Sequence, residues 1–208
     1  MATVIVLHGR NGHYGQLYEL GERTWHTSLG DRVKFIYLKS PPSGEWFTFK
    51  ATNPLQLMAD ISRGSEITDV GSLEQATLPL EALINSEAQA VGGHSNIYLI
   101  GYSQGGMLAL WYSLKTSTPL GGVAVINSAV PVVNVNHHTF PFCSDKPIVH
   151  FHGTSDIIVP PTFAQRGHDL VRAAGCSDYT LHMSPGGHDL THHVAQRVNS
   201  WLVDHIHR

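Results

Sequence analysis

Short runs of apolar, often β-branched residues recur along the chain, and segments with the spacing of helices separate several of them. The runs are TVIVLH (3–8), RVKFIYL (32–38), NIYLIG (96–101), GVAVIN (122–127), PIVHFHG (147–153) and YTLHM (179–183). A nearly continuous apolar run, without polar alternation, is typical of a strand that is covered on both faces, as in a parallel sheet. Because helices alternate with these strands, the sequence predicts an α/β fold with a doubly wound, mostly parallel central sheet and helices on both faces.

The expected helices follow from their apolar spacing. They cover 72–91, 105–115, 161–175 and 190–206. Ser72 is the expected N-cap of the first, with Gln75 three residues later as in a capping box. Pro79 lies inside this segment and predicts either a kink or a later start. Gly175 is expected to end the third helix. The segment 39–65 shows no such pattern and is expected to be a long irregular loop, which in a compact domain is usually functional or mobile.

The length and charge of the chain limit what kind of protein it can be. Its 208 residues suit one domain, spanning 1–208, with one hydrophobic core. Thirteen basic and sixteen acidic residues give a net charge of −3, which argues against a nucleic-acid partner because such proteins present a basic face. No apolar stretch reaches the roughly 18 residues of a membrane-spanning helix, so no integral membrane segment is expected.

The cysteines and histidines bear on compartment and metal binding. Cys143 and Cys176 are far apart, and the first residues lack the features of a secretory signal. We therefore expect two free thiols in a reducing compartment and a cytoplasmic protein. The fifteen histidines include adjacent pairs at 137–138 and 192–193 but no HExxH spacing. We expect them to be mostly surface residues, with no metal ligands among them.

One serine stands between glycines where the third apolar run meets a helix. The stretch Gly101–Tyr102–Ser103–Gln104–Gly105 is a GxSxG motif in a strand–turn–helix context. Glycines at both ends let strand and helix approach closely, and Ser103 then sits at the helix N-terminus, where unpaired N–H groups make the field positive. That position suits a nucleophile whose substrate develops an oxyanion. The competing interpretation is an ordinary tight turn with a capping serine.

A serine nucleophile needs a base and an acid, which in this type of sheet follow it in the order acid, then histidine. Asp156 follows the fifth run, at the carboxyl end of a strand, where such sheets carry their sites. Asp145 precedes that strand, Asp169 lies in a helical segment, and Asp178 precedes the sixth run. Asp156 is therefore the expected acid, against the alternative of an ordinary surface aspartate.

The expected base is His188, in the loop between the sixth run and the last helix. Two backbone N–H groups are expected to form an oxyanion hole: that of Gln104, next to the nucleophile, and that of Arg10, in the glycine-containing loop after the first strand. A phosphate-binding loop is the competing idea for that loop, but the GxxxxGK[ST] pattern is absent.

Taken together, these motifs resemble the acyl-protein thioesterase, small carboxylesterase and lysophospholipase family of α/β-hydrolases. The similar stretches span most of the chain: VIVLHGRNG, GSLEQATLPLEALINSE, LIGYSQGGMLAL, HGTSDIIVP and GGH. The resemblance implies an α/β-hydrolase fold without a separate lid domain. Family members usually read HGLGD where this chain has residues 8–12, so Arg10 puts a cation in place of an apolar residue.

The resemblance also implies an activity. It predicts a serine hydrolase that cleaves carboxylic esters or acyl thioesters with Ser103, Asp156 and His188 and needs no cofactor. A small acyl ester or an acylated protein would be the substrate. Trp46, Phe47 and Ile158 are implied as the lining of an acyl pocket, with plain core packing as the alternative. A non-catalytic binding protein on the same fold and a small serine peptidase remain as other functions.

Overall fold

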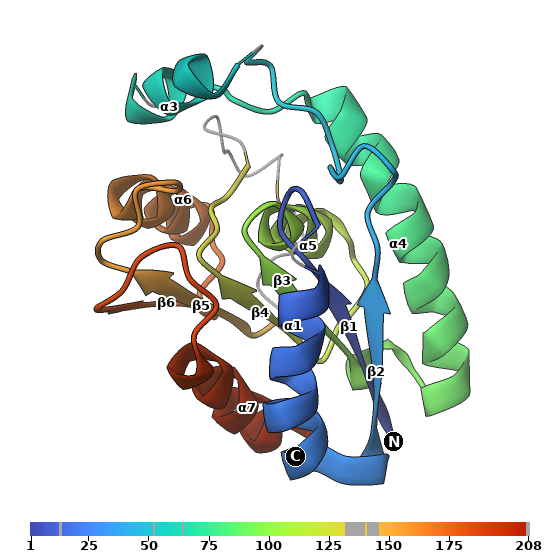
Figure 1. Cartoon of the computed structure of the whole chain (residues 1–208). Coiled ribbons are helices and arrows are strands. Elements are labelled where there is room, and N and C mark those ends of the chain that lie inside the picture. The colour runs from blue at the N-terminus through green and yellow to red at the C-terminus, as the bar shows by residue number, and fades with distance from the viewer. Residues whose placement is uncertain (13, 52, 64, 132–139, 141–145, 207–208) are drawn as a thin grey trace.

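The computed structural model describes the chain except for residues 13, 52, 64, 132–139, 141–145 and 207–208, and its centre is one parallel sheet. The strands are β1 (Ala2–Leu7), β2 (Val33–Leu38), β3 (Ile97–Tyr102), β4 (Gly122–Ile126), β5 (Ile148–Gly153) and β6 (Tyr179–Ser184). They are ordered β2-β1-β3-β4-β5-β6, and every neighbouring pair is parallel (Figure 1). Each strand lies within one residue of its predicted bounds, and the α/β class is confirmed.

Helices cover both faces of the sheet. In Figure 1, α1 (Tyr14–Gly21) and α7 (His192–Ile206) pack on one face. On the other face lie α4 (Val70–Val91), α5 (Gln104–Lys115) and α6 (Pro161–Ala173). Short helical turns join α1 to β2: a π-helical turn at Glu22–His26, α2 (Thr27–Leu29) and a 3-10 turn at Gly30–Arg32. A further 3-10 turn, His94–Asn96, precedes β3, and α3 (Pro54–Arg63) lies beyond the carboxyl ends of the strands.

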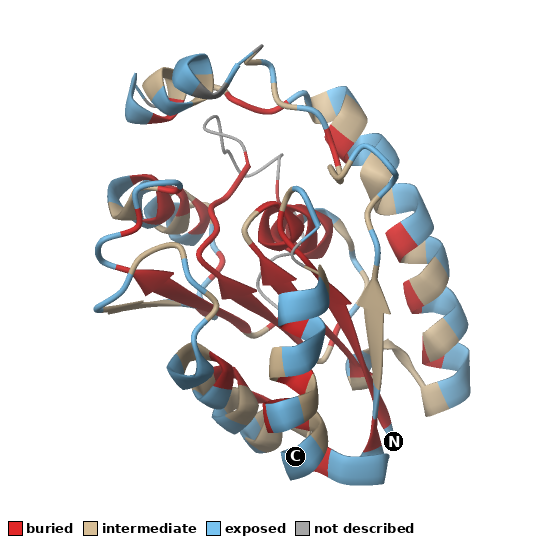
Figure 2. Ribbon diagram, in the orientation of Figure 1, coloured by how far each residue is buried: buried red, intermediate tan, exposed pale blue. Residues whose placement is uncertain are grey.

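Alternate side chains of each strand supply the two sides of the core. In β1, Val4 and Val6 join the cluster under α1 and α7, whereas Ile5 and Leu7 join the one under α4 and α5. Figure 2 shows the four inner strands, β1, β3, β4 and β5, buried along their length, whereas the edge strands β2 and β6 are mostly half-buried. Burying each such side chain stabilises the fold by about 1.5–3 kcal/mol. The sheet is therefore held from both sides, which gives the loops at its carboxyl edge a rigid base.

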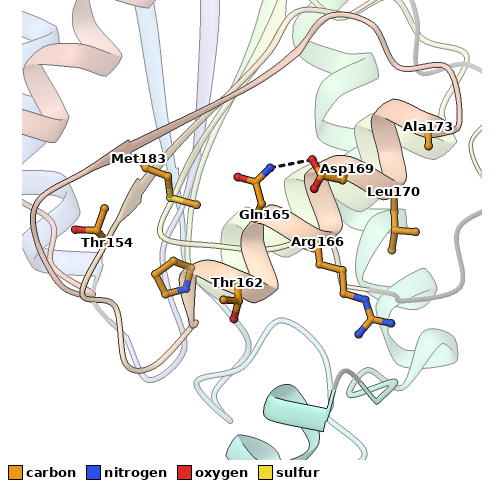
Figure 3. Close-up of a pocket in the computed structure, with 9 residues that line it drawn as sticks. Thr154, Thr162, Gln165, Arg166, Asp169, Leu170, Ala173 and Met183 are labelled. Carbon is orange, nitrogen blue, oxygen red and sulfur yellow. Dashed lines mark hydrogen bonds between the residues drawn. The ribbon is translucent and has the colours of Figure 1, made fainter.

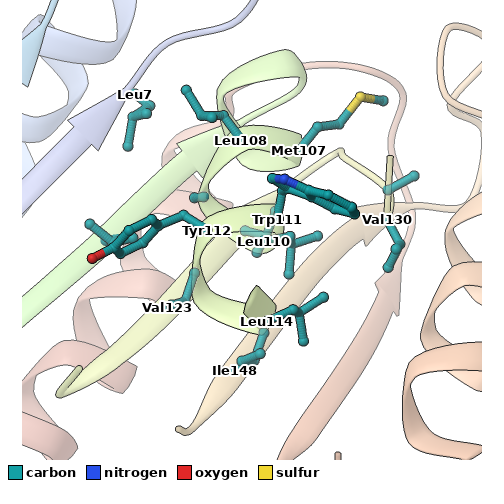
Figure 4. Packing of buried hydrophobic residues seen from close by; sticks show 14 of the residues in the cluster. Leu7, Met107, Leu108, Leu110, Trp111, Tyr112, Leu114, Val123, Val130 and Ile148 are labelled. Carbon is teal, nitrogen blue, oxygen red and sulfur yellow. The ribbon is translucent and has the colours of Figure 1, made fainter. Parts of the chain in front are cut away.

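Helix α5 is the most deeply buried of these helices, because the sheet and other elements surround it. Every residue from Gln104 to Leu114 is buried, and its apolar side chains interdigitate with those of β1, β4 and β5 (Figure 4). A helix that is apolar all round is expected to be buried in this way. The N-terminus of α5, which carries Ser103 as its N-cap, is consequently fixed against the centre of the sheet.

The first predicted helix begins earlier than its sequence pattern indicates. The N-cap of α4 is Asp69, whose side chain accepts a hydrogen bond from the Ser72 backbone, so the expectation of Ser72 as N-cap is wrong. Ser72 instead uses its hydroxyl to accept from the Thr48 N–H. The helix also runs unbroken through Pro79, which excludes the later start.

Two helices were not expected from the sequence. Helix α3 lies inside 39–65, so that segment is not irregular throughout. The stretch SPPSGEWF (40–47) gives the segment the composition of a loop, and the helix begins only after it, at Pro54. In α1, only Leu17 and Gly21 are buried, and two glycines interrupt the helix-forming residues.

Cys176 corrects another expectation, because it is disulfide-bonded. The prediction of two free thiols is wrong. Free thiols therefore no longer support the expectation of a reducing compartment. The one other cysteine of the sequence, Cys143, lies outside the described residues, as do Asp145 and the pair 137–138. Gly175 adopts a positive φ just after α6, as expected of a helix-ending glycine. None of the helices in the described part of the chain is both long and apolar enough to cross a membrane.

Candidate active site

Ser103 occupies a strained turn between β3 and α5. Its φ of 52° and ψ of −119° lie in a region that non-glycine residues rarely adopt. The turn is held by its neighbours: the Ser103 N–H donates to the Ile126 carbonyl at 3.0 Å, and the Ser128 hydroxyl donates to the Ser103 carbonyl at 2.7 Å. A Cβ on Gly101 would lie 2.5 Å from the Gly106 Cα, so a glycine is required for this close approach. The strain is of the kind that collects at functional sites.

The structure brings Ser103, His188 and Asp156 into one hydrogen-bonded row. Ser103 Oγ lies 3.0 Å from His188 Nε2, and His188 Nδ1 lies 2.7 Å from Asp156 Oδ2. The three residues come from the loops after β3, β6 and β5, which all end at the same edge of the sheet. The Asp156 side chain is fully buried, whereas that of His188 is 16% exposed. An acid thus orients a histidine, which in turn contacts a partly accessible hydroxyl.

Asp156 is held by the turn that follows it. Its Oδ1 accepts hydrogen bonds from the backbone N–H groups of Ile158 at 2.9 Å and Val159 at 2.8 Å. These two donors fix the orientation of the carboxylate and leave Oδ2 facing His188. Asp169, one of the alternative acids, instead pairs with His168 and Gln165 on an exposed face of α6.

Two residues that the sequence analysis did not identify support the His188 loop. The Tyr102 hydroxyl donates to the His188 carbonyl at 2.6 Å. Asn127, at a φ of 45°, donates its side-chain amide to the carbonyls of Gly187 and Asp189. Tyr102 lies inside the GxSxG motif and Asn127 directly follows a strand, so their positions at the carboxyl edge were the only available signal.

The loop after β1 passes directly over Ser103. A Cβ on Gly9 would lie 3.2 Å from the Ser103 Cβ and 2.9 Å from a ring carbon of Tyr102. Within the described part of the chain, the backbone N–H groups of Arg10 and Gln104 donate to no backbone carbonyl. The Arg10 side chain turns aside, pairs with Glu45 and lies over the Phe49 ring. Its charge is therefore matched by a carboxylate beside the loop.

Gln104 contributes a side chain whose role the sequence does not reveal. The side chain is buried; its oxygen accepts from the Trp46 N–H at 3.0 Å, and its amide donates to the Phe47 carbonyl at 2.8 Å. The Trp46 indole N–H in turn donates to the His8 carbonyl at 2.7 Å. Gln104 thus ties the segment around Trp46 to the base of the Ser103 turn.

The three residues implied as acyl-pocket lining have different surroundings. Trp46 borders a mainly apolar cavity of about 450 Å³ between the ends of β1 and β2 and helices α4 and α5. Phe47 is only 4% exposed and packs edge-on against Phe49 in the core. Ile158 is 52% exposed, two residues beyond Asp156. Only Trp46 and Ile158 therefore present side-chain surface outside the core.

A separate groove of about 750 Å³ lies along α6 and the end of β6. Figure 3 shows Thr162, Gln165, Arg166 and Asp169 on the helix, with Met183 on the strand opposite. None of its lining residues belongs to the Ser103–His188–Asp156 row. Size alone does not make it the reacting centre, since its Asp169 already pairs with Gln165. Among the described residues, no three His, Cys, Asp or Glu side chains gather as a metal site requires.

Comparisons with known proteins agree on one family. The sequence profile of the phospholipase/carboxylesterase family matches residues 1–206. The chain is 30% identical over 177 residues to acyl-protein thioesterase 1 homolog 2 of Dictyostelium discoideum, covering 80% of this chain and 75% of that protein. It is 31% identical over 141 residues to carboxylesterase SOBER1 of Arabidopsis thaliana, covering 67% of this chain and 61% of that one. The crystal structure of SOBER1 superposes with a TM-score of 0.82 at 23% identity, over 99% of both chains, a likeness that concerns the fold.

Proposed function

The chain belongs to the phospholipase/carboxylesterase family of α/β-hydrolases and is a hydrolase, and from that premise we propose that it cleaves carboxylic esters or acyl thioesters through a covalent acyl-enzyme. The observation that carries the proposal is the row from Ser103 Oγ through His188 to Asp156, with contacts of 3.0 and 2.7 Å. An exposed tight turn with a capping serine has no reason to place a buried acid behind a histidine in this way.

In the proposed reaction, Ser103 attacks the acyl carbonyl while His188 Nε2 accepts the hydroxyl proton. Asp156 keeps the imidazole in the tautomer that has its proton on Nδ1 and stabilises the imidazolium that forms. His188 then returns the proton to the departing alcohol or thiol. A water molecule, activated by the same histidine, attacks the acyl-serine and releases the carboxylic acid.

The backbone N–H groups of Gln104 and Arg10 are the proposed donors to the tetrahedral oxyanion. Gln104 begins α5, so its N–H also carries the positive end of the helix dipole. The Gly9 approach to Ser103 supports the second donor, because it puts the following peptide beside the nucleophile. Each such donor contributes roughly 10²–10³ in rate.

The proposed substrate is a small acyl ester or an acylated protein. We assign Trp46 and Ile158 as acyl neighbours, since both present apolar surface on segments bonded to the reacting residues. Phe47 is the third residue of this set, and its buried ring would act by holding Trp46 in place. The Arg10–Glu45 pair leaves this region without an unmatched arginine charge.

The test uses a fluorophosphonate probe and a panel of p-nitrophenyl esters of rising chain length beside acyl thioesters. We expect the probe to label Ser103, and Ser103→Ala to lower kcat by about 10⁶ while the protein stays folded. The matched control is Ser113→Ala, which changes a buried serine of α5 whose hydroxyl bonds within the helix. An unlabelled protein with unchanged turnover in Ser103→Ala would instead favour a binding protein or another reacting group.

A further inference from the structure

Beneath the Asp156 turn, three buried polar side chains form a hydrogen-bonded series. The proposed mechanism assigns no role to this series. The Tyr179 hydroxyl lies 3.0 Å from His150 Nδ1, and His150 Nε2 lies 3.1 Å from His152 Nδ1. His152 Nε2 lies 2.9 Å from the Val159 carbonyl. The exposed fractions of Tyr179, His150 and His152 are 1%, 0% and 1%. Buried polar groups at such distances are hydrogen-bonded, so each ring nitrogen has a definite donor or acceptor role.

The acceptor at one end sets the direction of these hydrogen bonds. The Val159 carbonyl can only accept, so His152 must carry its proton on Nε2. A neutral His152 then accepts on Nδ1, which requires His150 to donate from Nε2 and to accept from Tyr179 on Nδ1. Burial lowers the pKa of both histidines, so both rings are neutral, and it raises the pKa of the tyrosine, which keeps its proton.

The opposite direction is less favourable. It would let His150 Nε2 accept from the Ser128 N–H, but that separation is 3.4 Å, beyond the usual range of about 2.7–3.2 Å. It would also leave an unprotonated His152 Nε2 facing the Val159 carbonyl at 2.9 Å, with no hydrogen between two acceptors. The contact between His152 Nε2 and the Val159 carbonyl is shorter than that between the Ser128 N–H and His150 Nε2, and it therefore sets the direction of the hydrogen bonds. The donors run from Tyr179 through His150 to His152.

His152, at the end of this hydrogen-bonded series, contacts the turn that holds Asp156. Val159, whose carbonyl accepts from His152, donates its own N–H to Asp156 Oδ1 at 2.8 Å. His152 Nε2 is also 3.5 Å from Asp156 Oδ2, the oxygen that faces His188. A fixed His152 therefore constrains both the turn and the direction of the carboxylate.

We propose that Tyr179 and His150 are positioning residues that act through His152 to hold Asp156 against His188. The catalytic consequence rests on the proposed function, whereas the protonation pattern of the histidines does not. Since misplacing a reacting group by about 1 Å can cost 10² in rate, even a small rotation of the carboxylate affects turnover.

The first experiment reads the tautomers directly, by nitrogen-15 NMR of the histidine-labelled protein at neutral pH. We expect His150 and His152 to be neutral and protonated on Nε2 in the wild-type protein. This measurement needs no turnover, so it succeeds or fails independently of the Ser103 assignment. Finding His152 protonated on Nδ1, or charged, overturns the proposal.

The second experiment compares substitutions of His150 and Tyr179. His150→Leu removes the donor to His152 and should lower kcat by about 10- to 100-fold with KM unchanged. His150→Gln restores an N–H near the place of Nε2 and should recover most of kcat, which simple packing would not explain. Tyr179→Phe, the gentler change, should lower kcat less and give a mixture of His150 tautomers, because His150 Nδ1 loses its donor.

The control is Tyr98→Phe, which removes another buried tyrosine hydroxyl, bonded to the His205 carbonyl and carried by a strand of the same sheet. It should lower stability about as much as Tyr179→Phe and leave kcat unchanged. Should His150→Leu be poorly folded, Tyr179→Phe and the wild-type tautomers still decide the matter. Wild-type kcat in folded His150→Leu, or equal loss in the Leu and Gln variants, overturns the proposal.

Discussion

At the scale of single residues, the site depends on glycines that let backbones meet. Gly9 brings the loop after β1 onto Ser103, and Gly105 lets the start of α5 contact the end of β1, where an added Cβ would lie 2.4 Å from the His8 carbonyl. Neither residue carries a functional group. Their contribution is to bring the peptide groups after β1 and at the start of α5 close to the Ser103 hydroxyl, which is the arrangement that the proposed stabilisation of an oxyanion requires.

Gly9→Ala tests this point. The added methyl group would contact Tyr102 and Ser103 at 2.9–3.2 Å, so the loop must shift away from the nucleophile. We expect kcat/KM for a p-nitrophenyl ester to fall by about 10² with the fold retained. Gly15→Ala is the matched control, because nothing lies within 4 Å of its added Cβ and its φ is not in the positive range. Equal activity in both variants would contradict the placement of the oxyanion loop.

At the scale of elements, α5 organises the site through one residue, Gln104, which contributes both its backbone and its side chain. The Gln104 backbone begins the helix, while its side chain bonds to two peptide groups of the segment at Trp46 and Phe47. Hydrogen bonds from Gln104 therefore join that segment to the most deeply buried helix of the described fold. The loop between β2 and α3 is thereby held against the Ser103 turn, although its described residues form no helix or strand of their own.

Gln104→Leu removes both side-chain hydrogen bonds and keeps the backbone N–H. The Trp46 N–H and Phe47 carbonyl lose their partner, so the free energy of unfolding should fall by about 1–3 kcal/mol in urea denaturation. KM for longer acyl esters should rise because Trp46 is no longer held. Gln165→Leu, on the exposed face of α6, serves as control. A destabilised variant with wild-type KM would show that Trp46 does not contact the acyl group.

At the scale of the whole molecule, the parallel sheet brings residues that are far apart in the sequence together at the carboxyl edge of its strands. Loops after β1, β3, β4, β5 and β6 all meet there, and β1 lies between β2 and β3, where the chain changes direction. A crevice at such a switch point is where open α/β sheets bind ligands. The same arrangement buries polar groups deeply, among them His150 and His152 beneath the edge.

These buried histidines predict how stability depends on pH. Burial, with smaller contributions from neighbouring histidines, lowers the pKa of His150 below its ordinary value, and burial likewise lowers the pKa of His152. The unfolded chain therefore binds protons first, at its ordinary histidine pKa of about 6.5. The stabilisation is complete above that pH and is lost as the pH falls below it. Unfolding free energies measured by denaturant titration should show this decline from about pH 6.5 to 5.

Variants isolate the histidine contribution to that decline. His150→Gln removes one group that must stay neutral in the fold, so its stability should fall less steeply over the same pH range. His192→Gln, at an exposed position, should keep the wild-type slope. Identical slopes in all three proteins would mean that His150 does not resist protonation.

Local patterns were enough to predict much of the fold and the candidate site. The strands were located because residues covered on both faces must be apolar, and Ser103, Asp156 and His188 because each follows a strand at the edge where parallel strands end. Helices α1 and α3 were not predicted because glycines interrupt the sequence of α1 and because α3 follows a proline- and glycine-containing stretch that is typical of a loop. The acyl neighbours and the oxyanion donors stay predictions until they are tested.

By itself, the sequence determined the sheet, its parallel strands and the loops that bear the side chains proposed to react, since these follow from the order and periodicity of residues along the chain. Only the tertiary structure decided which distant groups meet: Gln104 with Trp46, Asn127 with the His188 loop, and Tyr179 with His150. It also decided that Cys176 is not a free thiol. The physical reason is that hydrogen bonds and disulfides depend on positions in space, and the partners here are separated by intervening strands and helices that leave no periodic trace in the sequence.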